Sequence, residues 1–290
     1  MNSKGAHFCD WSHTRGMPST IARSVTPELS RSWMLVNAAQ GDFDAAARSD
    51  ADQVILDLED AVDPRGKGAA RERVCTWLDT ATAWVRINDR TTRFWSDDID
   101  RLRGAPGLAG VMLAKAETAA QVSETFDRLG GHTPVIALIE SAIGVENAVE
   151  IARARGVLRL AFGSGDYRHD TGTAAEDAVM AYPRSRLVVA SRVAELPGPI
   201  DGPAVTDDVA VLEAKTATSV AFGLTGKLCL NASQPAVINR VASPSSEDTA
   251  WATDFLSEFE ARGRVVRDGS DPPRLKRAEK IARLAAEYTS

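Results

Sequence analysis

Short apolar runs alternate with amphipathic stretches through most of the chain. The runs are rich in Val, Ile and Leu and lack polar alternation, which is typical of parallel strands covered on both faces. We therefore expect strands at residues 33–39, 53–60, 83–89, 110–115, 134–141, 159–166, 197–203 and 219–230, of which 197–203 has the weakest pattern.

The stretches between these runs repeat apolar residues at helical spacing, for example at residues 69–78, 118–129, 145–155, 184–196 and 207–218. Eight strand–helix units in residues 30–240 match the count and size of one (β/α)₈ TIM barrel, an α/β fold. A doubly wound open sheet is the alternative. No G-x-G-x-x-G follows the first run, which argues against a dinucleotide-binding version of that sheet.

The two ends of the chain differ from this repeating pattern. Residues 1–29 lack clear periodicity and are expected to form an irregular N-terminal arm. Residues 249–262 and 273–288 have helical patterns and are joined by the turn-rich sequence DGSDPP. We therefore predict that residues 241–290 form a helical C-terminal extension on the barrel.

Charged and polar side chains gather where the apolar runs end. They are Asp57, Glu59 and Asp60 after the second run, Arg86 in the third, Lys115 in the fourth, Glu140 in the fifth and Asp166 in the sixth. Active sites of (β/α)₈ barrels lie at the carboxyl ends of the strands. We therefore expect these side chains to share one rim.

Glu140 and Asp166 end consecutive strands, so they should be neighbours. Adjacent carboxylates repel each other unless a cation or a proton lies between them. With oxygen ligands and no His or Cys nearby, the expected cation is Mg²⁺, with Mn²⁺ as an alternative.

Simpler interpretations of the same residues stay open. Glu140 can interact with a helix dipole, and Asp166 can form an Asx-turn. Arg86 can be a salt-bridge partner of Asp57 or Glu59, and Asp60 can cap the helix that follows.

The composition and charge of the chain limit which binding partners we expect. The 290 residues include 44% hydrophobic residues, and 34 basic against 40 acidic residues give a net charge of −6 with no basic run for nucleic acid. Cys9, Cys75 and Cys229 are odd in number and lack metal-binding spacing, which fits a reduced, cytoplasmic setting. No secretory leader pattern is found, and no apolar stretch approaches the ~18 residues of a membrane helix.

Six motifs occur in order: VILDLEDAVDPRGKGAAR, VRIN, LAKAE, ALIESAIGVENA, AFGSGDY and GLTGKLCLNASQ. From Arg31 to the C-terminus the chain resembles the citrate lyase β-subunit-like family of the HpcH/HpaI aldolase superfamily. The resemblance implies a TIM barrel that assembles as a trimer or hexamer and uses Mg²⁺. It also implies action on CoA or acyl-carrier thioesters of 3-hydroxy acids such as citryl, malyl and citramalyl.

The resemblance also assigns roles. It implies Glu140 and Asp166 as metal ligands, and Arg86 as the group that holds the carboxylate and keto oxygen of the product. It implies Asp57, Glu59 and Asp60 as residues that order metal-bound water and Arg86, and Asp271 as a proton carrier delivered to a neighbouring subunit. The remaining substrate-binding candidates are Arg31, expected near the thioester nucleotide, Lys67, Lys115 and Asn231.

The predicted activity is Mg²⁺-dependent cleavage of a 3-hydroxyacyl-CoA thioester into a 2-keto acid and an acyl-CoA, or the reverse condensation. Three alternatives remain open: a thioesterase, an aldolase for free keto acids, and a non-catalytic binding protein. The binding protein is motivated by two departures from the family pattern, of which the second also keeps the aldolase open. Asn37-Ala38 replaces Pro-Gly after the first strand, and Asn231 replaces His after the last.

Overall fold

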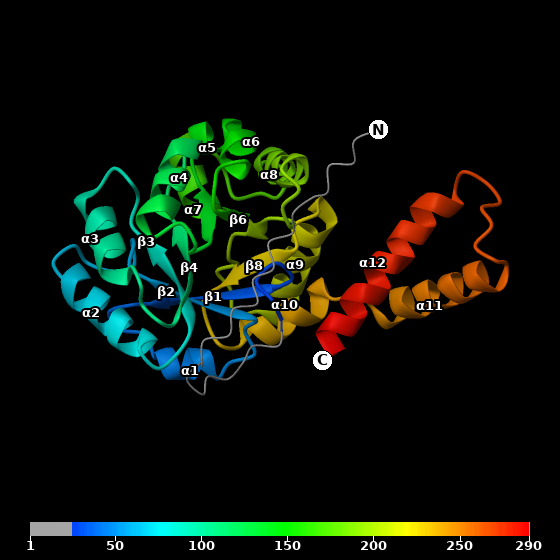
Figure 1. Cartoon of the computed structure of the whole chain (residues 1–290), viewed down its shortest axis with the longest axis horizontal. Coiled ribbons are helices and arrows are strands. Elements are labelled where there is room, and N and C mark those ends of the chain that lie inside the picture. The colour runs from blue at the N-terminus through cyan, green and yellow to red at the C-terminus, as the bar shows by residue number, and fades with distance from the viewer. Residues whose placement is uncertain (1–24, 290) are drawn as a thin grey trace.

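The computed structural model describes residues 25–289, so most of the predicted N-terminal arm lies outside the described part. Eight parallel strands pair in chain order and close into a barrel, which confirms the predicted (β/α)₈ fold (Figure 1). The strands are β1 Ser32–Asn37, β2 Gln53–Asp57, β3 Ala83–Ile87, β4 Leu108–Leu113, β5 Val135–Ile139, β6 Val157–Phe162, β7 Ile200–Asp201 and β8 Gly226–Cys229.

Helices surround the barrel and extend beyond it (Figure 1). Those that follow the strands are α1 Phe43–Ala47, α2 Lys67–Leu78, α3 Arg93–Leu102, α4 Ala119–Arg128, α5 Ala142–Glu146, α6 Ala148–Ala152, α7 Ser164–Thr171, α8 Ala181–Val193, α9 Val209–Phe222 and α10 Gln234–Ala242. The C-terminal extension consists of α11 Ser246–Ala261 and α12 Asp271–Thr289.

The predicted strand at residues 219–230 is wrong in its first part. Helix α9 continues to Phe222, because no helix-breaking residue comes before Gly223. Gly223 has a φ of 96°, a left-handed conformation that glycine adopts without a Cβ penalty, and it ends the helix. The apolar sequence therefore contains the end of a helix and a strand of four residues.

Side chains that point into the barrel follow the two-residue period of each strand. The packed interior contains Trp33, Ile55, Trp84, Met112, Ile136, Leu138, Ala161, Ile200 and Leu228. Asp57, Arg86 and Glu140 follow the interior residues Ile55, Trp84 and Leu138 by two positions. They therefore face the same side of each strand. The strand pattern that builds the core thus also aims charged groups at the carboxyl rim.

The opposite end of the barrel is closed by the segment that precedes β1. Arg159 is completely buried there and donates hydrogen bonds to the carbonyls of Pro27, Ser30 and Gly198. Gln53 donates to the Val25 carbonyl at 3.1 Å. We call this end the base, and its closure leaves the carboxyl rim as the open end.

The extension has a small hydrophobic core of its own. Ala252, Phe255 and Phe259 of α11 pack against Ala278 of α12, separately from the cores of the barrel. The two helices form a hairpin that projects from the barrel, with the C-terminus near α10 and the interhelical turn far out (Figure 1). No helix within residues 25–289 has the length and apolar character needed to cross a membrane.

Candidate active site at the carboxyl rim

Arg86 is held in a fixed orientation by Asp57. The two residues are register partners on β2 and β3, and Arg86 Nε and Nη2 each donate to one carboxylate oxygen of Asp57 at 2.7 Å. The third nitrogen, Nη1, lies 3.4 Å from Glu59 Oε2. The salt-bridge interpretation is therefore correct, because all three guanidinium nitrogens face the carboxylates of Asp57 and Glu59.

Glu59 and Lys115 form the next pair along the rim. Lys115 Nζ donates to Glu59 Oε1 at 2.9 Å and lies 3.4 Å from Asp60 Oδ2. Lys67 is turned towards the chain itself, because its Nζ donates to the carbonyls of Leu58 and Glu59 at 2.7 and 2.8 Å. Lys67 therefore fixes the backbone that carries Glu59, and the structure does not present it as an open substrate contact.

The Glu140 side chain directly follows β5 and is buried, whereas Asp166, in α7, is half-buried. Its Oε1 accepts the backbone N–H of Lys115 at 2.9 Å, while no described residue is seen to donate a hydrogen bond to Oε2. Burial, followed by the nearby negative charge of Glu59, raises the pKa of Glu140 to about 8 despite the Lys115 N–H and Arg86. A cation at this carboxylate would counter both causes.

Asp166 lies in the first turn of α7 and is close enough to Glu140 for its charge to contribute to the raised pKa. The rim thus has five carboxylates, from Asp57, Glu59, Asp60, Glu140 and Asp166, against the cations Arg86, Lys115 and Lys67. When ionised, these groups carry more negative than positive charge, which favours a bound cation.

The donor set fits Mg²⁺ bound mostly by water and substrate. Among residues 25–289 no group of three or more His, Cys, Asp or Glu side chains is arranged to hold a metal. Mg²⁺ commonly uses one or two carboxylates and keeps several waters. Glu59 Oε2 is buried and has no hydrogen-bond donor within the described chain, so it could accept a bond from such a water.

Gly163 is a part of this site that sequence reasoning missed. A Cβ at this position would lie 2.2 Å from Glu140 Oε2 and 2.5 Å from Glu140 Cβ. The Glu140 carboxylate can therefore occupy its place only because residue 163 has no side chain. A glycine directly after a buried strand, as in AFGSGDY, is the signal for such a close approach.

Asn231 lies after β8, but its side chain is engaged locally. Its Oδ1 accepts the Ser233 N–H and O–H, at 3.1 and 2.7 Å, and Nδ2 lies 3.4 Å from Asp207 Oδ1. Gln234 is buried and joins the loops, because it donates to the Ala204 and Thr206 carbonyls.

Asp271 lies in the extension, at the start of α12. It accepts the Arg267 N–H at 2.9 Å and is ion-paired with Arg262 at 3.0 Å. The Arg267 N–H is the main cause that lowers the pKa of Asp271, and the Arg262 side chain lowers it further. Within one protomer, Asp271 thus closes the α11–α12 turn.

Arg31 is not at the rim. It immediately precedes β1 at the base of the barrel, and its charge is paired with Asp52. The structure therefore does not bring Arg31 together with Glu140 and Arg86 at the rim.

Comparison with known proteins places this geometry in a family. Residues 31–232 match the family described as HpcH/HpaI aldolase/citrate lyase, and residues 247–289 match the HpcH/HpaI aldolase C-terminal domain. A citrate lyase subunit beta-like protein of Mycobacterium tuberculosis is 35% identical, with 89% of this chain and 96% of that protein covered. An L-malyl-CoA/beta-methylmalyl-CoA lyase of Cereibacter sphaeroides is 30% identical, with 84% and 90% covered.

A solved structure agrees with the sequence relatives. The M. tuberculosis protein CitE in complex with magnesium, acetoacetate and coenzyme A is similar with a TM-score of 0.75 and 30% identity, and 89% of this chain and 98% of that chain are covered. The relatives are lyases by name, which confirms the predicted enzyme class, a carbon–carbon lyase. On its sequence matches and its barrel alike, the chain belongs to the HpcH/HpaI aldolase/citrate lyase family.

Proposed function

We propose that this protein is a Mg²⁺-dependent lyase that cleaves a 3-hydroxyacyl-CoA thioester into a 2-keto acid and an acyl-CoA, or runs the reverse condensation. The observation that carries the proposal is Glu140, a buried carboxylate beside Arg86 on a rim with excess negative charge. Complexes of the M. tuberculosis relative support the ligand class, because they contain magnesium with pyruvate, with oxaloacetate, or with acetoacetate and coenzyme A.

Glu140 and Asp166 would hold the metal, which supplies a Lewis acid for the oxygen that develops negative charge. Arg86, fixed by Asp57, would bind the carboxylate of the substrate through its guanidinium group. The bond between the hydroxyl-bearing carbon and the carbon next to the thioester breaks, and its electron pair forms the thioester enolate. The hydroxyl proton leaves to a base, and one proton returns to the enolate carbon.

We assign the proton transfer to Asp271 of a neighbouring protomer in a trimer or hexamer. Within its own chain the pKa of Asp271 is lowered, which is the wrong direction for proton transfer near neutral pH. To act at a neighbouring rim, the buried Asp271 carboxylate would leave Arg262 and the Arg267 N–H and meet an excess of carboxylates. Both changes raise the pKa of an aspartate.

A free-acid aldolase is the second candidate. Asn37 and Asn231 replace the family residues near the expected thioester arm, and both are engaged within the chain. Asn37 donates to the Ala61 carbonyl at 2.6 Å and accepts the Ala39 N–H at 2.8 Å. The side-chain bonds of Asn231 to its own loop likewise favour a pocket that does not use these residues to bind CoA.

Product analysis tests the proposed reaction. With malyl-CoA, citramalyl-CoA and citryl-CoA, we expect a keto acid and an acyl-CoA in the presence of Mg²⁺, and no turnover by Glu140→Ala or Asp166→Ala. The exposed Glu150→Ala is the matched control and should behave as wild type. Free CoA with intact hydroxy acid would indicate a thioesterase, and turnover in both metal-ligand variants would reject the metal assignment.

The close approach at Gly163 makes a second prediction. In Gly163→Ala the new Cβ displaces the Glu140 carboxylate, so we expect Mg²⁺ affinity to fall at least tenfold, an effect of about 1.4 kcal/mol. Gly165→Ala is the control, because a Cβ at Gly165 meets no atom within 4 Å. Calorimetric titration with Mg²⁺ measures both affinities, and equal affinities would contradict the proposed role of Glu140.

Complementation between two inactive variants tests whether Asp271 acts in a neighbouring protomer. We expect Asp271→Asn and Glu140→Ala each to be inactive alone. When the two are co-expressed, a site is intact if its barrel comes from Asp271→Asn and its extension from Glu140→Ala. About a quarter of the sites in a mixed cyclic oligomer meet this condition, so about a quarter of wild-type turnover should return. Sedimentation would confirm that mixed oligomers form, and mixed oligomers without restored activity would show that Asp271 does not act in a neighbouring site.

A further inference from the structure

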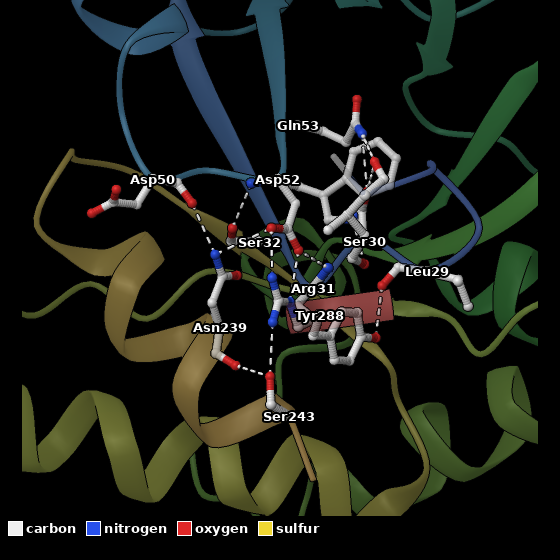
Figure 2. A network of polar contacts seen from close by, with 12 residues as sticks. Leu29, Ser30, Arg31, Ser32, Asp50, Asp52, Gln53, Asn239, Ser243 and Tyr288 are labelled. Carbon is white, nitrogen blue, oxygen red and sulfur yellow. Dashed lines mark hydrogen bonds and ion pairs between the residues drawn. The ribbon is translucent and has the colours of Figure 1, made fainter. Parts of the chain in front are cut away.

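A polar network at the base joins the barrel to the extension (Figure 2). Arg31 lies at its centre, where Nε and Nη2 donate to the two oxygens of Asp52 at 2.9 Å. Arg31 Nη1 donates to Ser243 Oγ at 2.8 Å. The guanidinium carbon lies 3.9 Å from the ring centre of Tyr288, a cation–π distance.

These contacts hold both ends of the extension. Ser243 follows α10 directly, at the point where the chain leaves the barrel, and it also donates to the Asn239 carbonyl at 2.6 Å. Tyr288 lies in the last turn of α12, and its hydroxyl donates to the Leu29 carbonyl at 2.9 Å. One buried guanidinium therefore contacts the first and last parts of the extension.

The length of α12 makes this attachment mechanically important. At 1.5 Å per residue, the 17 residue steps of α12 from Tyr288 back to Asp271 span about 26 Å. A rotation of about 10° at the base would then move Asp271 by about 5 Å. A misplacement of only about 1 Å can lower catalysis about a hundredfold.

The apolar core of the extension does not fix it against such a rotation. Its apolar core is formed by its own residues, Ala252, Phe255, Phe259 and Ala278, and is separate from the barrel cores. The angle of the hairpin must therefore be fixed mainly where it meets the base. There, the ion pair of Arg31 with Asp52 keeps the guanidinium in one plane, against which the Tyr288 ring stacks.

We propose that Arg31, Asp52, Ser243 and Tyr288 form a base clamp that sets the angle of the extension and so positions Asp271 for a neighbouring protomer. This inference rests on the proposed function, in which Asp271 acts in that neighbouring site. Arg31 and Tyr288 are positioning residues, because they lie at the end of the barrel opposite to Glu140 and Arg86.

Substitutions at Tyr288 test the clamp. Tyr288→Leu removes the stacked ring and the hydroxyl, whereas Tyr288→Phe keeps the ring over Arg31. We expect Tyr288→Leu to lower kcat at least tenfold with unchanged Mg²⁺-dependent keto-acid binding, and Tyr288→Phe to retain most of the turnover. The control is Arg277→Ala, also on α12, which removes an exposed ion pair with Asp248 of α11 and should leave kcat unchanged.

Co-expression separates positioning from a general loss of structure. Tyr288→Leu with Glu140→Ala should recover turnover, because the second variant supplies an intact extension to the intact barrel of the first. Wild-type kcat in Tyr288→Leu would overturn the clamp. So would joint loss of keto-acid binding and turnover that co-expression does not restore.

A distance measurement tests the clamp without any catalytic readout. The distance between two spin labels reports the angle of the hairpin. The labels are attached at Glu150→Cys on the barrel and Val266→Cys at the tip of the extension, two exposed positions, in a Cys9→Ser background. Tyr288→Leu should broaden the distance distribution, and an unchanged distribution would reject the clamp. Failure of the proposed function would instead appear as a wild-type protein without Mg²⁺-dependent cleavage.

Discussion

The placement of Glu140, a buried carboxylate among other carboxylates, is the constraint on which the rim depends. Burial and the charge of Glu59 oppose its ionisation, whereas the Lys115 N–H and Arg86 favour it. An uncompensated buried charge is costly, so a folded chain keeps one where a cation or a proton is to be bound. The surrounding geometry is consistent with that purpose, because Gly163 makes room for the carboxylate and Asp57 holds Arg86 beside it.

The two ends of the barrel differ in how they are closed and in their charge. At the base, Arg159 and Gln53 are satisfied by backbone carbonyls and close the interior. Arg31 also lies there and has its charge neutralised by Asp52, so it offers little to an anionic ligand. At the rim, acidic groups outnumber basic ones and Glu59 Oε2 has no donor within residues 25–289. Closing one end leaves a single open face for chemistry, and the extension starts from the closed end.

The sequence predicted the parts of the structure that follow from strand periodicity. The inward positions of Asp57, Arg86 and Glu140 follow from alternation along buried strands, because each lies two residues beyond a core side chain. The order of parallel strands then places Glu140 near Asp166. These are local rules, and the tertiary structure does not override them.

Other features depend on contacts that a single sequence does not display. The end of α9 was mispredicted because its last residues are apolar enough for a strand, and only the left-handed Gly223 marks the boundary. The partners of Arg31, which are Asp52, Ser243 and Tyr288, are distant from it in sequence, so the motif around Arg31 does not reveal them. Similarly, the Arg262 and Arg267 contacts that lower the pKa of Asp271 arise from the fold of the turn.

The most direct test of the central claim is calorimetry with oxaloacetate, pyruvate and glyoxylate, with and without Mg²⁺, and before and after addition of acetyl-CoA. The account predicts that one keto acid binds only with Mg²⁺ and binds more tightly once acetyl-CoA is present. Such a result would also identify the acid half of the substrate. Keto-acid binding that is equal with and without Mg²⁺ would contradict the assignment of Glu140 and Asp166, and binding that ignores acetyl-CoA would contradict a thioester substrate.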